Sequence, residues 1–214
     1  IVQVSAVVTA VFDDCVYIED ESRVAGIRVE GNVGEAAVDD RVRVTGAMGV
    51  TDDLELRISA SSTVVIGTGH IAPLHVNAGN LGGDGIAPAT DRQPVKAWRW
   101  VKTEDGEPAT RELASIAGMS NLSLLVRCTG KVVWAGPGRF YLDDGSARDD
   151  FEHPDPVQDR PQGLRVLLPE GVDVPETECQ VAVTGISSCH KNGDNLFRVL
   201  RVWRAEDIAP VPAD

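Results

Sequence analysis

The chain has 214 residues, of which 43% are hydrophobic and 25% are charged, a composition typical of a globular protein. Its 33 acidic side chains outnumber its 20 lysines and arginines and give a formal net charge of −13, which disfavours binding to a polyanion such as nucleic acid. No apolar run approaches the ~20 residues with which a helix crosses a bilayer, so we expect no membrane insertion.

Short segments of the first half of the chain recur in the same order in the second half. The spacing between the two copies is nearly constant except at one loop, 145–162, which is longer in the second copy and rich in Asp and Pro. Tyr17–Asp20 matches Tyr141–Asp144, Gly26–Val29 matches Gly163–Val166, Val42–Gly46 matches Val181–Gly185, and Ile71–Pro73 matches Ile208–Pro210. This order predicts a tandem duplication.

Each copy is a series of short segments in which apolar and polar residues alternate. Alternation with a period of two is typical of a strand that has one face in a core, and turn residues separate the segments. The predicted strands of the first copy are Val4–Phe12, Cys15–Ile18, Ile27–Val29, Val42–Gly46 and Glu55–Val65. The sequence therefore predicts an all-β protein with almost no helix.

Five strands, with a long first strand, a glycine after the fourth and a long last strand, resemble the oligonucleotide/oligosaccharide-binding fold (OB-fold), a small Greek-key barrel. In addition, Gly118–Arg127, Gly130–Val132 and Phe140–Ser146 resemble a pattern in uncharacterised exported bacterial proteins with tandem domains of this kind, which have no assigned chemistry.

The resemblance implies two five-stranded Greek-key barrels, at residues 1–76 and 121–209, with a tail at 210–214. It also implies an extracellular or cell-surface location. Because the chain begins with Ile1 and not Met, we expect a processed or excerpted product whose export signal is already removed. The alternative all-β fold is a single two-sheet sandwich.

The segment between the copies, 77–120, contains Gly and Pro too often for continuous regular structure. It also carries large apolar residues, which forgo roughly 1.5–3 kcal/mol each if they stay in water, so we expect it to wrap over one or both barrels. These residues are Leu81, Ile86, Trp98, Trp100, Leu113 and Ile116. Residues 110–117 are predicted to form one short helix, with Thr110 as its cap and Gly118 at its end.

The familiar motifs of enzymes are absent from the sequence: it has no phosphate-binding glycine loop, nucleophile elbow, zinc-protease motif or Cys-x-x-Cys pair. Cys189 and His190 are adjacent, and neighbours in a strand point to opposite faces, so they do not readily hold one metal ion. We therefore expect no enzymatic activity. An enzyme would need a polar cleft on which carboxylates converge.

A dense group of acidic residues lies in the second copy, at Asp143, Asp144, Asp149 and Asp150. Several carboxylates from one flexible loop are the ligands that calcium prefers, so this loop is the candidate metal site. The spacing does not match the helix-loop-helix calcium motif, and the alternative is that these are turn residues that accept local hydrogen bonds. No other cofactor is expected.

Four cysteines, an even number, are consistent with disulfides outside the cytosol. In the barrel that the resemblance implies, the first and fourth strands pair antiparallel, which brings Cys128 near Cys189 as a candidate bridge. Cys15 and Cys179 would then pair or face a neighbouring molecule. The alternative is four reduced, buried thiols.

A binding module for single-stranded nucleic acid or oligosaccharide needs exposed aromatic rings, and nucleic acid also needs a basic groove. The candidate residues are Arg127, Lys131, Arg139, Tyr141, Arg201 and Trp203. Strand alternation indicates that Tyr141 or its neighbours fill the core, and no segment of the chain is net positive. An oligosaccharide tolerates the acidity better, because sugars stack on aromatic rings without positive charge.

The function that we favour from the sequence is a non-enzymatic structural or interaction module, a subunit of an extracellular surface layer or filament. Its partners would be further copies, in head-to-tail contact, or other surface proteins. Partly open barrels expose strand edges, so the apolar segment 1–11, with Ile1, Val2 and Val4, is the candidate strand that completes a neighbour's sheet. The sequon at Asn121 would carry a glycan only in a host that makes that linkage.

Overall fold

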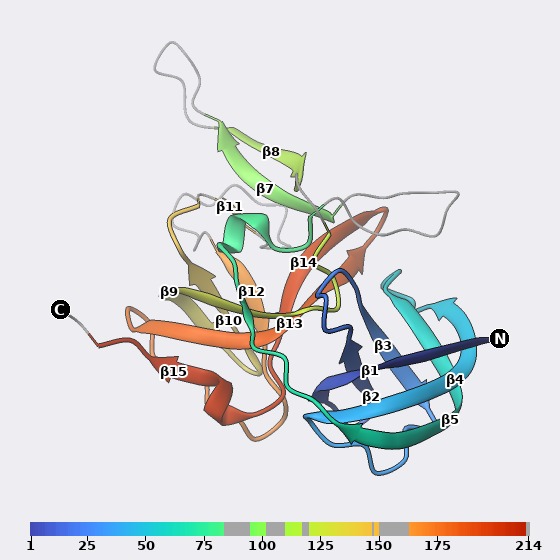
Figure 1. Ribbon diagram of the computed structural model, residues 1–214. Helices are drawn as coiled ribbons and strands as arrows, with labels where there is room; N and C mark the ends of the chain where they lie inside the picture. The colour runs from blue at the N-terminus through green and yellow to red at the C-terminus, as the bar shows by residue number, and fades with distance from the viewer. Residues whose placement is uncertain (84–94, 102–109, 117–119, 147, 150–162, 213–214) are drawn as a thin grey trace.

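The computed structural model describes residues 1–83, 95–101, 110–116, 120–146, 148–149 and 163–212 (Figure 1). These residues form strands, turns and two short 3-10 segments, without an α-helix. The strands pair into two separate sheets. The all-β prediction with two five-stranded units is therefore confirmed, and the single sandwich is not formed.

The first unit is a closed barrel whose strands pair in the order β1-β2-β3-β5-β4. Its strands are β1 (Val2–Val11), β2 (Cys15–Glu19), β3 (Gly26–Gly31), β4 (Asp40–Val50) and β5 (Leu56–Thr68). Neighbouring strands are antiparallel, except that β3 and β5 pair in parallel. The five predicted strands of this copy are all present, and each is longer than the sequence indicated.

The second unit repeats this arrangement. Its strands are β9 (Leu125–Gly136), β10 (Arg139–Asp143), β12 (Leu164–Leu167), β13 (Gln180–Asn192) and β14 (Asn195–Arg201). They pair in the order β9-β10-β12-β14-β13, and β13 pairs again with β9. The parallel pair is β12 with β14, at the position of β3 with β5. The repeat in the sequence is thus a repeat of strand order.

Each unit has its own apolar core, built from the inward residues of alternating strands. Val8, Val16, Val29 and Ile58 belong to the first core. The second core includes Val126, Phe140, Leu142, Val166 and Leu200. Phe140 and Leu142, the neighbours of Tyr141, fill this core, as the alternation of β10 predicted.

A glycine lies at the same place in the fourth strand of both units. A Cβ on Gly46 would overlap the carbonyl oxygen of Ser59 in β5, and one on Gly185 would lie 2.6 Å from the carbonyl oxygen of Arg201 in β14. The absence of a side chain therefore allows the fourth and fifth strands to approach closely.

The segment between the units adds strands to the second sheet. It contains β6 (Leu74–His75), a 3-10 turn (Ala78–Asn80), β7 (Val95–Val101) and β8 (Thr110–Ser115). β6 pairs with β9, and β7 pairs with β14 and with β11 (Arg148–Asp149). Leu81 and Ile116 are completely buried, which confirms that this segment covers apolar surface.

The helix predicted at 110–117 is wrong, because Thr110–Ser115 is strand β8 and pairs antiparallel with β7. An isolated helix of two turns is marginal in water, whereas the ladder with β7 satisfies the same backbone groups at once. The chain ends with a 3-10 turn (Ala205–Asp207) and β15 (Ile208–Pro210), which pairs with β13. None of the helical segments that the structure describes has the length and apolarity to cross a membrane.

Candidate functional site

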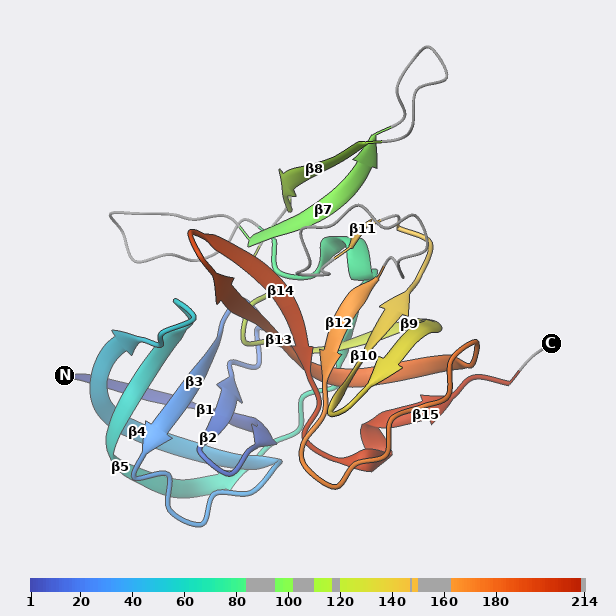
Figure 2. The same ribbon diagram turned by 180° about the vertical axis from the view of Figure 1, so that it is seen from behind.

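A buried seam joins the two units, which lie side by side with β13 and β14 next to the first unit (Figures 1 and 2). Its apolar part consists of Ala10, Cys15 and Tyr17 from the first unit and Leu125 and Ile186 from the second. All five residues of β2 are buried. Val16 and Ile18 face the first core, and the other three residues face the second unit. The outward face of β2 is therefore an interface and not a solvent-exposed surface.

The centre of the seam is polar and is built around the carboxylate of Glu55, whose residue is only 3% exposed. The Tyr17 hydroxyl donates to Oε2 of Glu55 at 2.8 Å, and the Ser123 hydroxyl donates to Oε1 at 3.1 Å. Arg201 of β14 donates from Nη1 to the Tyr17 oxygen at 3.0 Å. Both carboxylate oxygens thus have donors, one of them from the other side of the seam.

Burial dominates the electrostatics of this group. It raises the pKa of the Glu55 carboxyl, and the hydrogen bond from Tyr17 and the charge of Arg201 only partly oppose this shift. Burial likewise raises the pKa of the Tyr17 phenol, and the neighbouring carboxyl of Glu55 adds to the effect. Tyr17 therefore stays a neutral donor in the seam.

A second buried carboxylate, that of Glu19, forms a hydrogen bond across the seam to the first residue of β9. Its Oε2 accepts the backbone N–H of Leu125 at 2.8 Å, and its Oε1 lies 3.3 Å from Nε of Arg23. Burial raises the pKa of Glu19, and the bond from Leu125 opposes that rise. Glu19 thus satisfies a backbone donor that would otherwise be buried without a partner.

Local backbone conformations position the seam groups. Leu54, next to Glu55, has φ 61°, and Ser123 has φ 65°, both in the left-handed region that bulky residues rarely adopt. The tight turn at Leu54 is closed by a bond from its N–H to the carbonyl of Thr51, at 3.0 Å. Gly26 of the first unit lies so close to Ser123 of the second that a Cβ on Gly26 would overlap the carbonyl oxygen of Ser123.

A cleft of about 210 Å³ opens beside this network, between the two units. Its polar lining consists of Arg28, Asp53, Glu55, Ser188, His190 and Arg201. Asp53 lies 3.2 Å from Nδ1 of His190 through its Oδ1, and the same oxygen accepts the backbone N–H of Lys191 at 2.8 Å. Arg28 forms ion pairs with Asp14 and Glu30, both at 2.6 Å.

Two carboxylates therefore converge on the cleft, which is the arrangement that an enzyme would require. Both already accept hydrogen bonds from the protein: Glu55 from Tyr17 and Ser123, and Asp53 from the backbone of β13. Through these bonds both carboxylates connect the first unit to the second.

The residues predicted to bind a polymer do not gather on one surface. Arg201 is in the seam, with its guanidinium 4.4 Å from the ring centroid of Phe12, and Trp203 packs against the same cluster. Tyr141 is buried, and its ring makes an edge contact with Trp134 at 5.6 Å between centroids.

The other three candidates lie on β9 and β10. Arg139 is exposed and sits over the Trp134 ring at 5.8 Å. Lys131 forms an ion pair with Glu178 at 3.0 Å. Arg127 is half-buried and is opposite Thr184 in the β9–β13 ladder. The six side chains thus do not form a continuous basic groove with aromatic platforms.

The acidic loop that was the candidate calcium site is described only in part. Asp143 accepts the N–H of Gly145 at 2.8 Å, and Asp144 accepts the N–H groups of Ser146 at 3.0 Å and Ala78 at 2.6 Å. The side chain of Asp149 and all of Asp150 lie outside the described residues. Within the part that is described, no three potential ligands come together. Asp143 and Asp144 act there as acceptors that shape a turn.

All four cysteines are free thiols, and the predicted Cys128–Cys189 bridge is wrong. Cys128 is opposite Val183 in the β9–β13 ladder, six residues from Cys189 along β13 and thus about 20 Å away. The β9–β13 ladder ends at Ile186, and further along β13 Cys189 pairs with Arg198 of β14. Burial raises the pKa of Cys15 and of Cys128 to about 12, whereas Cys179 is exposed.

The segment predicted to complete a neighbour's sheet is used within its own barrel. β1 pairs with β4 from Val2 to Val7 and with β2 from Val7 to Val11. Val2 and Val4 pack against the first core, and of the three proposed residues only Ile1 is fully exposed. Barrel closure therefore uses both edges of β1 only around Val7, and residues 2–6 pair on the β4 side alone, so the assembly role of segment 1–11 stays a prediction.

A different strand presents apolar side chains to solvent. Val64, Val65 and Ile66 of β5 are 53%, 49% and 38% exposed, the longest run of exposed large hydrophobic residues in the described part of the chain. We call these three residues the β5 strip. β3 pairs with β5 only from Arg57 to Ala60, so beyond that point the described strands pair with β5 on the β4 side alone.

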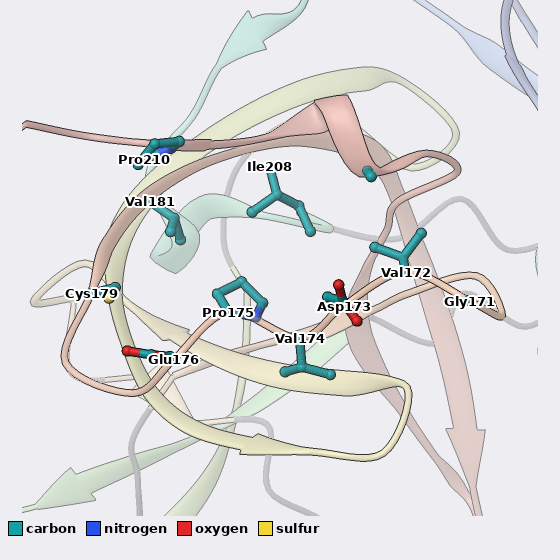
Figure 3. Close-up of a pocket in the computed structure, with 11 residues that line it drawn as sticks. Gly171, Val172, Asp173, Val174, Pro175, Glu176, Cys179, Val181, Ile208 and Pro210 are labelled. Atoms are coloured by element: carbon teal, nitrogen blue, oxygen red, sulfur yellow. The ribbon is translucent and has the colours of Figure 1, made fainter.

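An apolar groove of about 410 Å³ lies at the far end of the second unit, between the 168–179 loop and β15 (Figure 3). Apolar side chains surround it, including Val172, Val174, Val181 and Ile208, and Asp173 and Glu176 lie among them (Figure 3). Cys179, the exposed cysteine, lies at one edge. We call this site the acidic-rimmed groove.

The sequon residue Asn121 is buried, and both its amide oxygen and its amide nitrogen form hydrogen bonds. Its oxygen accepts the N–H of Gly82 and the hydroxyl of Ser187, both at 2.7 Å, and its nitrogen donates to the carbonyl of Asn80 at 2.8 Å. Asn121 therefore fastens the intervening segment to β13 and is not positioned to accept a glycan.

Comparisons with family models, with curated proteins and with solved structures find no match to this chain. The resemblance to exported tandem-barrel proteins accordingly rests on the sequence motifs alone.

Sequence reasoning missed the seam, the β5 strip and the acidic-rimmed groove. The strip had a visible signal, since three consecutive β-branched apolar residues break the alternation of β5. The apolar part of the seam had one too, since Cys15–Ile18 is a continuous apolar run, which indicates a strand buried on both faces, whereas the buried carboxylates Glu19 and Glu55 had none.

Proposed function

We propose that this protein is a non-enzymatic structural module of an extracellular assembly, which associates with further copies or with other surface proteins through the β5 strip. The extracellular location belongs to this proposal, and its support is the resemblance in sequence to exported tandem-barrel proteins. The observation that carries the proposal is the exposed apolar run on a strand edge.

The internal use of the charged groups supports a structural role. Glu55, Glu19 and Arg201, three charged side chains of the seam, each have a hydrogen-bond partner within the protein. Their effect is to fix one unit against the other, and a rigid two-unit body is suited to transmit a defined geometry from one contact to the next.

The β5 strip supports association more directly. An exposed strand edge with β-branched side chains is a template for pairing with another chain, and soluble monomers usually block such an edge with charge, proline or a bulge. Val64, Val65 and Ile66 carry no charge and no proline, and the one irregularity of this stretch is a register shift against β4 at Ile66.

The proposal is tested by a matched pair of substitutions, Val64→Asp in the strip and Val24→Asp at an isolated exposed valine. Sedimentation velocity and negative-stain microscopy at rising protein concentration should show assemblies for the wild type and for Val24→Asp, and monomers for Val64→Asp, because a charge in an apolar contact must be desolvated. A wild type that stays monomeric throughout would refute the proposal.

The second candidate, a module for single-stranded nucleic acid or oligosaccharide, has weaker support. Tyr141 is buried, Arg201 is held in the seam and Lys131 is ion-paired, so binding would have to break existing contacts. A screen of glycans and oligonucleotides at low salt tests this alternative, and saturable binding that is lost on Trp203→Ala would favour it.

A further inference from the structure

We infer that the acidic-rimmed groove is the docking site for the β5 strip of a second copy of this chain. The inference rests on the proposed function, because it names the surface that the strip would contact. It commits to a second copy and not to an unrelated protein.

The first argument is the apolar match. The groove measures about 410 Å³ and is lined by branched or cyclic apolar side chains such as Val174, Pro175 and Ile208. A cavity of about 150 Å³ already holds a molecule of benzene, so the groove has room for more than one aliphatic side chain. The strip supplies Val64 on the face that also carries Arg43, while Val65 lies on the opposite face at the rim of the barrel, so the groove would take Val64 first.

The second argument is charge. The loop that forms the groove, 168–179, contains four acidic residues and no basic one. Two of them, Asp173 and Glu176, line the groove and are exposed. Beside the strip, Arg43 is exposed and is the cross-strand neighbour of Val64, on the same face of the sheet. Opposite charges therefore accompany the two apolar surfaces.

The third argument is placement. β4 and β5 lie at one end of the molecule and β15 at the other, with the seam between them (Figures 1 and 2). A contact between two different surfaces of identical chains is heterologous, and it continues into a ring or a filament according to its rotation. Each copy would have one strip and one groove to offer, which makes the contact head-to-tail.

The test uses two variants of the whole chain, each of which lacks one partner surface. Val64→Asp disables the strip and keeps the groove. Asp173→Lys with Glu176→Lys reverses the groove charges at exposed positions and keeps the strip. Like charges then face Arg43, and we expect association of the groove variant to weaken by at least about tenfold. Each variant alone should therefore be mainly monomeric in sedimentation velocity.

Mixing the two variants is the decisive step. The intact groove of the strip variant and the intact strip of the groove variant can still meet once, so the mixture should form a one-to-one dimer. Cys179 reports which groove is occupied, since it is the exposed cysteine at the groove edge while the other three are buried. Its rate of alkylation should fall in the strip variant on mixing and stay unchanged in the groove variant.

The outcomes separate this inference from the proposed function. A mixed dimer with Cys179 protected in the strip variant supports both. If the wild type assembles but the groove variant assembles equally well, or the mixture forms no dimer, the groove is not the partner and the inference is wrong while the proposed function stands. A monomeric wild type whose Cys179 reacts at the same rate at all concentrations overturns the proposed function.

Discussion

At the scale of single residues, Glu55 shows how hydrogen bonds compete with the loss of hydration in the seam. Its carboxylate has good donors on both oxygens, and yet burial raises its pKa, because two neutral hydroxyl donors do not replace the hydration that the charge has lost. Arg201 contributes a favourable charge through the Tyr17 hydroxyl. The ionised form of Glu55 is thus held in place at some cost to stability.

This cost predicts a pH dependence. A carboxyl whose pKa is raised on folding contributes stability that is fully present below its unfolded pKa of about 4.3 and is lost as the pH rises through the folded value. Glu55→Gln removes the titration. As the pH is raised from below the unfolded pKa through the folded pKa of Glu55, the free energy of unfolding of the wild type should therefore fall relative to that of Glu55→Gln. Urea denaturation at a series of pH values measures both.

The control for this measurement is Glu35→Gln at an exposed position, which should follow the wild type at every pH. Parallel profiles for the wild type and Glu55→Gln would show that Glu55 titrates in the folded protein as it does in the unfolded chain.

Residue-level predictions from the sequence succeeded where they depended on neighbours along the chain. The alternation of β10 predicted that either Tyr141 or its neighbours fill the core, and the neighbours, Phe140 and Leu142, do so. Predictions that needed a distance between strands failed: the Cys128–Cys189 bridge assumed a register, and the observed ladder separates the two residues by about 20 Å. Register depends on side-chain packing across strands, which one strand's pattern does not reveal.

At the scale of elements, close contact between backbones limits which residues the seam tolerates. A Cβ on Gly26 would overlap the carbonyl oxygen of Ser123, a seam residue already in a left-handed conformation. Gly67, in β5, offers the opposite case, because a Cβ there would meet no atom within 4 Å. Both glycines belong to strands, and neither has a positive φ, so they form a matched pair.

We expect Gly26→Ala to lower the free energy of unfolding by about 1–3 kcal/mol, the usual cost of forcing extra volume into a packed interface. Gly67→Ala should stay within about 0.5 kcal/mol of the wild type. Chemical denaturation measures both. If Gly26→Ala and the wild type had the same free energy of unfolding, the backbone at the seam would be able to move apart at Gly26 without destabilising the protein.

The element scale also shows what alternation can and cannot predict. It located all five strands of the first unit, since each has one face in the core. It did not predict β8, because Thr110–Ser115 gains its strand conformation from pairing with β7 and not from a core of its own. It also did not predict that β1 divides its pairing, with β4 up to Val7 and with β2 from Val7 onward.

At the scale of the whole molecule, the formal net charge of −13 opposes association between copies. Raising the salt concentration from about 0.01 M to about 0.1 M shortens the screening length from about 30 Å to about 10 Å. Long-range repulsion is lost over this range, while an apolar contact between the strip and its partner is not weakened. We therefore expect the assembled fraction of the wild type, measured by sedimentation, to rise.

Val64→Asp should remain monomeric over the same range and serves as the control for unspecific aggregation. An assembled fraction that falls steadily with salt would mean that ion pairs, and not apolar contact, hold the copies together.

The tandem organisation was predictable because duplicated segments keep their order in the sequence. The mutual placement of the units was not, since Glu55, Ser123 and Arg201 meet only after both barrels have formed.

The distance along the chain between Tyr17 and Arg201 affects how the protein is made. Their hydrogen bond spans 184 residues, and at synthesis rates of 5–20 residues per second the ribosome needs roughly 10 to 40 s to make that stretch. Until then the outer face of β2 lacks the part of its cover that comes from β13 and β14. We expect Glu19 and Glu55, on the uncovered face of the nascent first unit, to favour its solubility during this interval, as apolar side chains at these positions would not.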